Sequence, residues 1–303
     1  MRDDLDIVPA FPKVINIETT NRCNLNCVIC PRHDAMNRPV GDMMWTLFQR
    51  VIDEIAASSV PGSPPTIGLH LFGEPLLHPD LLRQIRYVKT VLPTSGLYLS
   101  TNVALLRGTL AEGLASSLLD WIVLSLDGAT KETYERVRRG ASFDTAVANV
   151  RGFLEMLERQ GTDDMHVWVQ LVAADEGLTG EVEQFYQTWG SWEKRLPRMR
   201  VVIKPATDWA GQVPITPVEG SDEKENIPRP GRCRRVVEQL NVYWNGEVTA
   251  CCYDVGGLLK VGSVQEESLA AIWHGSQMTF LREVFRQGKQ RRLPLCRTCE
   301  DAG

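Results

Sequence analysis

The chain has 303 residues, a formal net charge of −5 at pH 7, and 43% hydrophobic and 23% charged residues. This charge gives no support for nucleic-acid binding through a basic surface and is compatible with a cationic small substrate. The sequence has no apolar run long enough to cross a membrane and begins with an acidic segment, so we expect no membrane span, no signal peptide and a cytoplasmic location.

Short apolar runs alternate with amphipathic stretches along the first 204 residues. The strand candidates are rich in β-branched residues and cover 14–20, 66–72, 97–102, 121–127, 166–173 and 199–204. The clearest helix candidates between them are WTLFQRVIDEIAAS, HPDLLRQIRYVKTVL and FDTAVANVRGFLEMLERQ. Six βα units with short loops predict an α/β fold whose parallel sheet curls into a partial (β/α)6 TIM barrel. Functional residues are then expected at the carboxyl ends of the strands.

The chain changes character after residue 210. Residues 211–231 contain four prolines, three glycines and a charge run, which predicts a linker or long surface loop. Beyond it, the Asn245-Gly246 pair predicts a hairpin turn, and SLAAIWHGSQMTFLREVFRQ predicts helix. We therefore expect a barrel over 1–210 and a small hairpin-plus-helix domain over 232–303, stabilised by a bound metal centre.

Eight cysteines stand at the two ends of the chain, and none falls between residues 31 and 232. In a reducing cytosol this clustering favours metal or iron–sulfur ligation over disulfides. The first three form a C-x3-C-x2-C motif directly after the first strand candidate, and three thiolates leave one iron of a four-iron cube open. A structural zinc loop or three unrelated thiols are the alternatives. The cysteines are Cys23, Cys27, Cys30, Cys233, Cys251, Cys252, Cys296 and Cys299.

Four motifs, CNLNCVIC, LFGEP, STN and SLDGATKETYERVR, stand at or just after the carboxyl ends of the first four strand candidates. Together they resemble the radical SAM superfamily over roughly residues 14–204. The resemblance implies that Cys23, Cys27 and Cys30 hold a [4Fe-4S] cluster whose open iron binds S-adenosylmethionine. Reductive cleavage of this cofactor would give a 5′-deoxyadenosyl radical that removes a hydrogen atom from the substrate.

The same resemblance implies roles for residues that follow the cysteines. Gly73 permits a close backbone approach and Glu74 accepts from the methionine ammonium. Asn102 contacts the ribose or the methionine, and Ser125 with Arg138 holds the methionine carboxylate. Arg136 or Arg139 is an alternative to Arg138. Ile29, which precedes the third cysteine, packs on the adenine where many members have an aromatic residue.

The C-terminal cysteines resemble the SPASM auxiliary-cluster module in its shortened twitch form. The resemblance implies a second [4Fe-4S] cluster held by Cys233, Cys251, Cys296 and Cys299, although a structural zinc uses the same ligand types. After the hairpin turn, TACCYD predicts a returning strand on which Cys251 and Cys252 point to opposite faces. Cys252 is then the spare thiol. It either fills a gap in the core, as buried cysteines commonly do, or gives a hydrogen atom to a substrate radical.

A hydrogen-donating thiol favours an epimerase, and twitch-like cysteines with an extra thiol resemble the radical epimerase of neomycin biosynthesis. We therefore expect inversion of a carbon stereocentre in an aminoglycoside, with flavodoxin or ferredoxin as electron donor. The alternatives are an alcohol dehydrogenase acting on an aminocyclitol or amino sugar, a peptide-modifying enzyme and a non-enzymatic metal-stapled protein. In a dehydrogenase Lys204 is a candidate base.

Charged and histidine side chains near the strand ends complete the set of candidates. Acidic residues that could bind substrate ammonium groups are Asp127, Asp175, Asp208 and Asp254. His70 precedes the LFGEP motif on a strand candidate, so we expect it to be structural. His78 follows the motif and is expected at the start of a helix.

Overall fold

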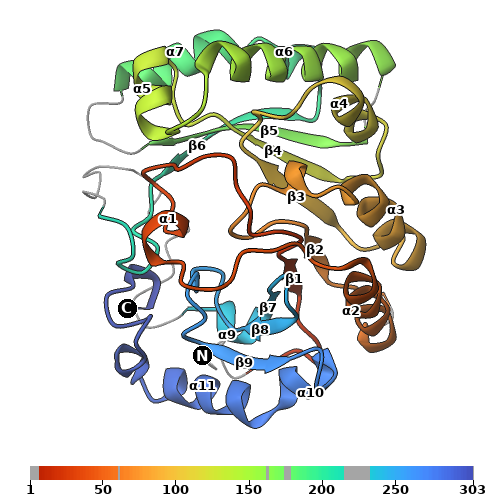
Figure 1. Cartoon of the computed structure of the whole chain (residues 1–303), viewed down its shortest axis with the longest axis vertical. Helices are drawn as coiled ribbons and strands as arrows, with labels where there is room; N and C mark the ends of the chain where they lie inside the picture. The colour runs from red at the N-terminus through yellow and green to blue at the C-terminus, as the bar shows by residue number, and fades with distance from the viewer. Residues whose placement is uncertain (1–6, 61, 162–163, 174–178, 215–232, 303) are drawn as a thin grey trace.

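The structure is a computed structural model that describes residues 7–60, 62–161, 164–173, 179–214 and 233–302. Within these ranges the strands form one sheet in the order β6-β5-β4-β3-β2-β1-β7-β8-β9 (Figure 1). The strands are β1 (Val14–Ile17), β2 (Thr66–Gly68), β3 (Leu97–Thr101), β4 (Trp121–Ser125), β5 (His166–Ala173), β6 (Met199–Pro205), β7 (Gln239–Val242), β8 (Glu247–Thr249) and β9 (Lys260–Ser263).

The first six strands lie side by side in chain order, and each pairs in parallel with the next. This confirms the predicted partial barrel. All six strand candidates contain strands. The cysteine triplet and LFGEP lie in loops beyond β1 and β2, whereas STN and SLDG begin within the last residues of β3 and β4, so all four motifs stand at the carboxyl edge of the sheet. That edge is where a parallel barrel gathers its functional side chains.

Helices cover the outer face of the barrel strands (Figure 1). They are α2 (Trp45–Ser58), α3 (Leu81–Val91), α4 (Gly108–Ala115), α5 (Lys131–Val137), α6 (Phe143–Gln160), α7 (Thr179–Trp189) and α8 (Trp192–Arg195). Local chemistry sets the ends of α6, because the Ser142 hydroxyl accepts from the Thr145 amide and Gly161 takes the left-handed conformation at φ 62°. Two shorter helices lie in the loops, α1 (Arg32–Ala35) and the 3-10 helix η2 (Pro75–Leu77).

Strand β5 shows how the barrel separates its two faces. Val167, Val169 and Leu171 are buried, and they belong to the main hydrophobic core. The alternating residues His166, Trp168 and Gln170 are half-buried. Successive strand residues point to opposite faces, so the half-buried residues of β5 face the inside of the barrel.

The C-terminal strands extend the barrel sheet. β7 pairs in parallel with β1, and β8 and β9 follow it in antiparallel order. The predicted hairpin forms, with Gly246 at φ 88° in its turn. The elements that complete this region are α9 (Arg235–Glu238), α10 (Leu269–His274), α11 (Ser276–Arg286), η4 (Gln290–Arg292) and η5 (Glu300–Ala302). Of the predicted linker, residues 215–231 lie outside the described ranges.

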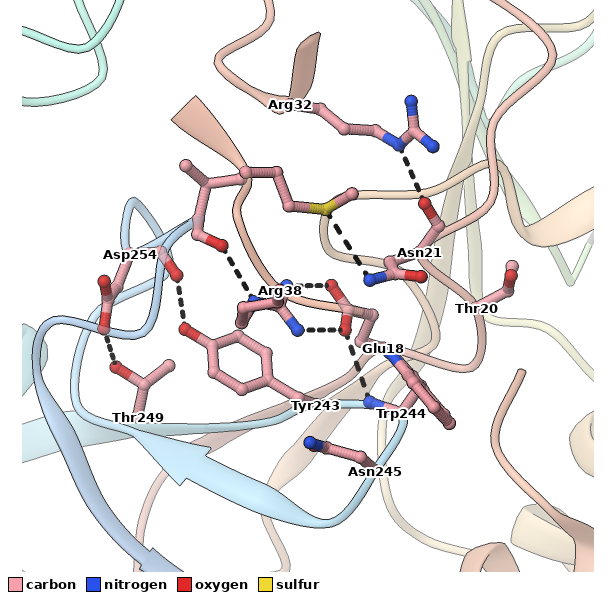
Figure 2. Close-up of polar contacts among 12 residues, drawn as sticks. Glu18, Thr20, Asn21, Arg32, Arg38, Tyr243, Trp244, Asn245, Thr249 and Asp254 are labelled. Atoms are coloured by element: carbon pink, nitrogen blue, oxygen red, sulfur yellow. Dashed lines mark hydrogen bonds and ion pairs between the residues drawn. The ribbon is translucent and has the colours of Figure 1, made fainter. Parts of the chain in front are cut away.

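A buried ion pair fastens the barrel to the C-terminal hairpin (Figure 2). Arg38, in the loop after the cysteine triplet, donates to both carboxylate oxygens of Glu18 at 2.8 and 3.0 Å. Its Nε donates to the Val255 carbonyl at 2.8 Å, and its guanidinium stacks 3.6 Å from the ring centroid of Tyr243. Tyr243 in turn donates to the Asp254 carbonyl. The segment that follows Cys251 and Cys252 is therefore held against the end of β1.

None of the helices in the described part of the chain combines the length and apolarity needed to cross a bilayer.

Candidate active site

A cavity of about 450 Å³ opens at the carboxyl edge of the barrel strands. It is lined by the three N-terminal cysteines, by the loops after β2, β3 and β4, by the inward face of β5 and by the segment after β6. The lining includes all the residues predicted for the first cluster and its cofactor: Cys23, Cys27, Ile29, Cys30, Gly73, Glu74, Asn102, Ser125 and Arg138. Residues spread over more than a hundred positions thus share one site.

The three N-terminal thiols meet polar donors inside this cavity. The side-chain amide of Asn102 points at the Cys23 sulfur at 3.8 Å, and the Arg138 guanidinium points at the Cys27 sulfur at 3.9 Å. Burial raises the pKa of all three thiols, to about 11 for Cys27. A thiolate is the ligand form, so a bound cation must offset this burial, and the nearby donors favour the charged sulfur.

Within the described ranges, no three His, Cys, Asp or Glu side chains converge closely enough to bind one metal ion. A four-iron cube does not need such convergence, because each thiolate binds a different iron. Three thiols around one cavity, with donors aimed at two of them, fit a cluster with an open iron.

Glu74 connects the ends of β2 and β3. Its buried carboxylate accepts from the Thr101 hydroxyl and the backbone amide of Asn102, both at 2.7 Å, and from the backbone amide of Leu76 at 3.0 Å. Burial is the largest influence and raises its pKa, although these donors act in the opposite direction. Most of the acceptor capacity of Glu74 is therefore used within the protein. Its role toward a methionine ammonium stays a prediction.

Gly73 permits a close backbone approach, as expected, but the partner is the chain itself. A Cβ built there would lie 2.2 Å from the Thr20 carbonyl oxygen and 2.8 Å from that of Arg22. The adjacent Glu74 amide donates to the Arg22 carbonyl at 2.8 Å. The LFGEP loop therefore packs directly on the segment that leads into the cysteine triplet.

Arg138 and Ser125 stand on the β4 side of the cavity. Arg138 forms a buried ion pair with Asp127, and its Nε is buried and has no partner among the residues that the structure describes. Burial acts to lower the pKa of Arg138, but the Asp127 carboxylate outweighs it and the pKa is raised. The Ser125 hydroxyl lies 3.5 Å from that of Ser100. A guanidinium with an unused donor and a hydroxyl that line the same cavity fit the predicted carboxylate site.

Ile29 is accompanied by aromatic side chains that sequence reasoning missed. Its carbonyl accepts from the Trp209 indole at 2.9 Å. Trp209 lies 6.2 Å from the Phe72 ring and 5.1 Å from the Tyr253 ring, and all three line the cavity. These aromatics come from distant segments, so spacing gave no signal, although TDWAG after a strand was a usable hint for Trp209.

The C-terminal cysteines gather around Arg235. This guanidinium points at the Cys233 sulfur at 3.7 Å, pairs with Asp301 at 2.7 Å and lies 4.1 Å from the Tyr253 ring centroid. Burial raises the pKa of Cys233, Cys299 and Cys296, for Cys296 to about 12. As with the first three thiols, ligation of a cation by the charged form would offset this cost.

The placement predicted for Cys251 and Cys252 on a strand is wrong. β8 ends at Thr249, and the two cysteines lie in a turn closed by the Asp254 amide, which donates to the Cys251 carbonyl at 3.2 Å. Strand alternation therefore does not separate them. A hydrogen bond between the two thiols raises the pKa of Cys251 and lowers that of Cys252.

Cys252 is half-buried and is not among the side chains that line the cavity, whereas the next residue, Tyr253, is. The Cys252 thiol is nevertheless close enough to Tyr98, inside the barrel, to contribute to the raised pKa of that phenol, for which burial is the larger cause.

The candidate acidic residues are largely occupied by the protein. Asp127 pairs with Arg138 and accepts from the Val172 amide at 2.9 Å. Asp254 accepts from Thr249 and from two backbone amides, and Asp208 accepts from the Ala210 amide. Asp175 lies outside the described residues. Both Asp127 and Asp254 hold the fold together through these contacts, and their use as ammonium sites stays a prediction. Lys204 does line the cavity.

The two histidines differ from expectation in one case. His78 is buried, with Nε2 3.2 Å from the Met43 carbonyl and Nδ1 accepting from the Asp80 amide at 3.1 Å, next to the start of α3. β2 ends at Gly68, so His70 is not on a strand, and it lines the cavity.

Comparison with known proteins places this site in a family. Residues 17–168, half of the chain, match the radical SAM superfamily. The chain belongs to that superfamily. Residues 233–300 match SPASM, an iron-sulfur cluster-binding domain. This radical SAM protein therefore uses S-adenosylmethionine and two [4Fe-4S] clusters, as its two resemblances implied.

Individual relatives of this radical SAM protein are distant. The AdoMet-dependent heme synthase of Methanosarcina barkeri is 32% identical over 46% of the chain, but the match spans only 38% of the synthase. The tungsten-containing aldehyde ferredoxin oxidoreductase cofactor-modifying protein of Pyrococcus furiosus is 24% identical over 95% of the chain and 87% of its own length. The S-adenosyl-L-methionine-dependent 2-deoxy-scyllo-inosamine dehydrogenase of Niallia circulans is 19% identical over 95% of the chain and 92% of its own length.

Solved structures share the fold over nearly the whole chain. BtrN in complex with AdoMet and 2-DOIA has a TM-score of 0.65 at 16% identity, covering 97% of this chain and 94% of BtrN. Streptococcus suis SuiB bound to precursor peptide SuiA has a TM-score of 0.70 at 14% identity, covering 97% of this chain and 71% of SuiB. At these identities the likeness shows the fold alone.

Proposed function

We propose that this radical SAM protein is an epimerase that inverts a carbon stereocentre of an aminoglycoside of the neomycin type. The whole-length similarity to a dehydrogenase of 2-deoxy-scyllo-inosamine supports a small polyhydroxylated substrate. Reductive cleavage of bound S-adenosylmethionine supplies the radical that removes a hydrogen atom from the substrate carbon. We propose flavodoxin or ferredoxin as the electron donor.

The ligand sets follow from the two groups of thiols. We propose that Cys23, Cys27 and Cys30 hold the cluster that binds S-adenosylmethionine. The second cluster would take all four of its ligands from the C-terminal region, namely Cys233, Cys251, Cys296 and Cys299. Such a closed cluster has no iron free for substrate.

The cavity residues would orient the cofactor and keep water away. Arg138, with its buried unpartnered Nε, and Ser125 would hold the methionine carboxylate, and Asn102 would contact the ribose or methionine. Glu74 would fix the two strand-end loops and accept from the methionine ammonium with its remaining capacity. Ile29, with Trp209 bound to its carbonyl, would pack on the adenine.

The epimerase assignment depends on one observation, the position of Cys252, the cysteine that neither proposed cluster uses. Cys252 lies between a proposed ligand, Cys251, and a side chain that lines the cavity, Tyr253. Cys251 bound to the cluster as a thiolate has no proton to donate, so the hydrogen bond that lowers the pKa of Cys252 is lost and Cys252 can keep its own proton. In the proposed step the Cys252 S–H bond breaks and a C–H bond forms on the face of the substrate carbon opposite to the abstracted hydrogen. One electron from the external donor and one proton from solvent then restore the thiol. Cys252 does not line the cavity in this structure, so the proposed step requires a local movement of the turn that carries it.

The alternative is an alcohol dehydrogenase, which the 2-deoxy-scyllo-inosamine dehydrogenase relative favours. There the substrate radical loses an electron and a proton, and Lys204, which lines the cavity, is the candidate base. A peptide-modifying reaction finds support in the similarity to mycofactocin maturase MftC of Mycobacterium ulcerans, 29% identical over 65% of this chain.

Turnover of neomycin C by wild type and Cys252→Ala tests the proposal. An epimerase of this kind gives the inverted product in the wild type, while the variant forms 5′-deoxyadenosine without inversion. An oxidised product that is unaffected by the substitution would establish the dehydrogenase instead. Lys204→Met is the companion variant, because loss of the candidate base should suppress an oxidation but not an inversion that uses Cys252.

A further inference from the structure

We propose that His70 is a specificity-determining residue that donates a hydrogen bond from Nε2 to a hydroxyl oxygen of the substrate. This inference rests on the proposed function only in taking the substrate to be a small polyhydroxylated molecule. It concerns a residue whose sequence position alone indicated a structural role.

His70 has an unusual environment for a polar side chain. It lines the cavity, and its Nδ1 is buried without a hydrogen-bond partner within the described part of the chain. Its ring stands edge-on to Tyr98, with the centroids 4.9 Å apart. Tyr98 is not available to it, because that hydroxyl donates to Asn16 at 2.5 Å. Buried polar groups without a partner are rare, and each one needs an explanation.

The ring is neutral at physiological pH, since burial lowers the pKa of His70 to about 4. A neutral imidazole has one donor and one acceptor nitrogen. An unpaired acceptor is tolerated more readily than an unpaired donor, so the unpartnered Nδ1 is assigned as the acceptor and the proton to Nε2. Nε2 is not among the buried unpartnered atoms, and it is left for a molecule in the cavity.

The other polar groups of the cavity indicate what that molecule offers. Protein donors take up most of the acceptor capacity of Glu74 and Asp127, so the described lining offers little carboxylate capacity for a substrate ammonium group. Ser100 on β3 and Gln170 on β5 line the same cavity with neutral side chains. A neutral donor such as His70 Nε2 fits a hydroxyl oxygen, and a site that donates to a hydroxyl discriminates strongly against an analogue that lacks one.

The test compares His70→Phe, which keeps the aromatic contact with Tyr98, with His70→Gln, which returns a donor near Nε2. His166→Phe is the matched control, because His166 stacks on Trp121 outside the cavity. Each enzyme is reconstituted, assayed for iron and sulfide, and titrated with neomycin C and separately with 2-deoxy-scyllo-inosamine while 5′-deoxyadenosine formation is followed. We expect the KM of the stimulating probe to rise roughly tenfold in His70→Phe, with kcat changing much less. The KM of His70→Gln should stay within about threefold of the wild-type value.

A KM in His70→Phe equal to that of the control would overturn the assignment, as would an equal rise in both His70 variants. If neither probe stimulates the wild type, the proposed substrate is wrong, but His70 is still testable. In that case the pKa of His70 is measured in the wild-type holoenzyme by hydrogen–deuterium exchange at histidine C2, followed by mass spectrometry. The same measurement is used if His70→Phe fails to bind iron. Titration of His70 below about pH 5 supports the assignment, and titration near the ordinary value of about 6.5 overturns it.

Discussion

Arg38 binds both carboxylate oxygens of Glu18, and the side chains of this pair are 6% and 0% exposed. The pair links the end of β1 to the hairpin region, because Arg38 also holds the Val255 carbonyl (Figure 2). Removing one member leaves a buried charge without its partner. We therefore expect Arg38→Met to lower the free energy of unfolding by about 3–5 kcal/mol, measured by urea denaturation.

Two variants sharpen that measurement. Glu18→Gln combined with Arg38→Met removes both charges, and it should recover part of the loss. Arg195→Met breaks the exposed pair with Glu158 and should have a much smaller effect. Equal destabilisation by Arg38→Met and Arg195→Met would mean that the buried pair does not connect the two parts of the chain.

Gly73 is expected to be intolerant of a methyl group. Its Cβ would lie 2.2 Å from a backbone oxygen of Thr20, and backbone atoms cannot move aside as a side chain can. Gly73→Ala should therefore displace the LFGEP loop and reduce 5′-deoxyadenosine formation on the order of 100-fold. Gly152→Ala is the control, because nothing lies within 4 Å of its Cβ position on α6. It should leave activity intact and stabilise the protein by about 0.5–1 kcal/mol. Full activity of Gly73→Ala would contradict the contact.

The stability of the protein should depend on pH through His70. In the unfolded chain the imidazole binds a proton below about pH 6.5, whereas in the folded protein its pKa is about 4. Between these values the unfolded chain holds more protons, so stability is lost as pH falls. Wild type should lose about 2–3 kcal/mol more than His70→Phe between pH 7 and pH 4, measured by urea unfolding at each pH. Parallel curves for the two proteins would show that folding does not lower the pKa of His70.

The two neighbouring cysteines should differ in iron binding. Cys251→Ala removes a proposed ligand of the second cluster and should lower iron and sulfide to roughly half. Cys252→Ala should keep the full amount. The opposite pattern would assign Cys252 as the ligand and Cys251 as the spare thiol, which the shared turn allows geometrically.

Much of the barrel was predictable, because its strands are short runs rich in β-branched residues and its helices are amphipathic stretches. The helix candidates at α2 and α6 coincide with the observed bounds. The cysteines and strand-end motifs were also identifiable, since their chemistry resides in short local patterns. The pairing of β7 with β1 was not, because both strands are short and the pairing depends on contacts about 225 residues apart, such as Asn16 with Asn241.

The missed site features have the same origin. Trp209 and Tyr253 meet only in the folded chain, and the lack of a partner for His70 is a property of its surroundings. The turn at Cys252 was mistaken for a strand because TACCYD follows a good hairpin signal. β8 ends early as Asp254 accepts from Thr249, Leu258 and Leu259 and draws the chain into a loop.

The central claim is that Cys252 returns a hydrogen atom to the substrate, and turnover of neomycin C by the wild-type enzyme in deuterium oxide tests it most directly. A thiol exchanges its hydrogen with solvent, so the account predicts one deuterium at the inverted carbon of the product, detected by mass spectrometry and located by NMR. An inverted product without solvent deuterium, or an oxidised product, would contradict it.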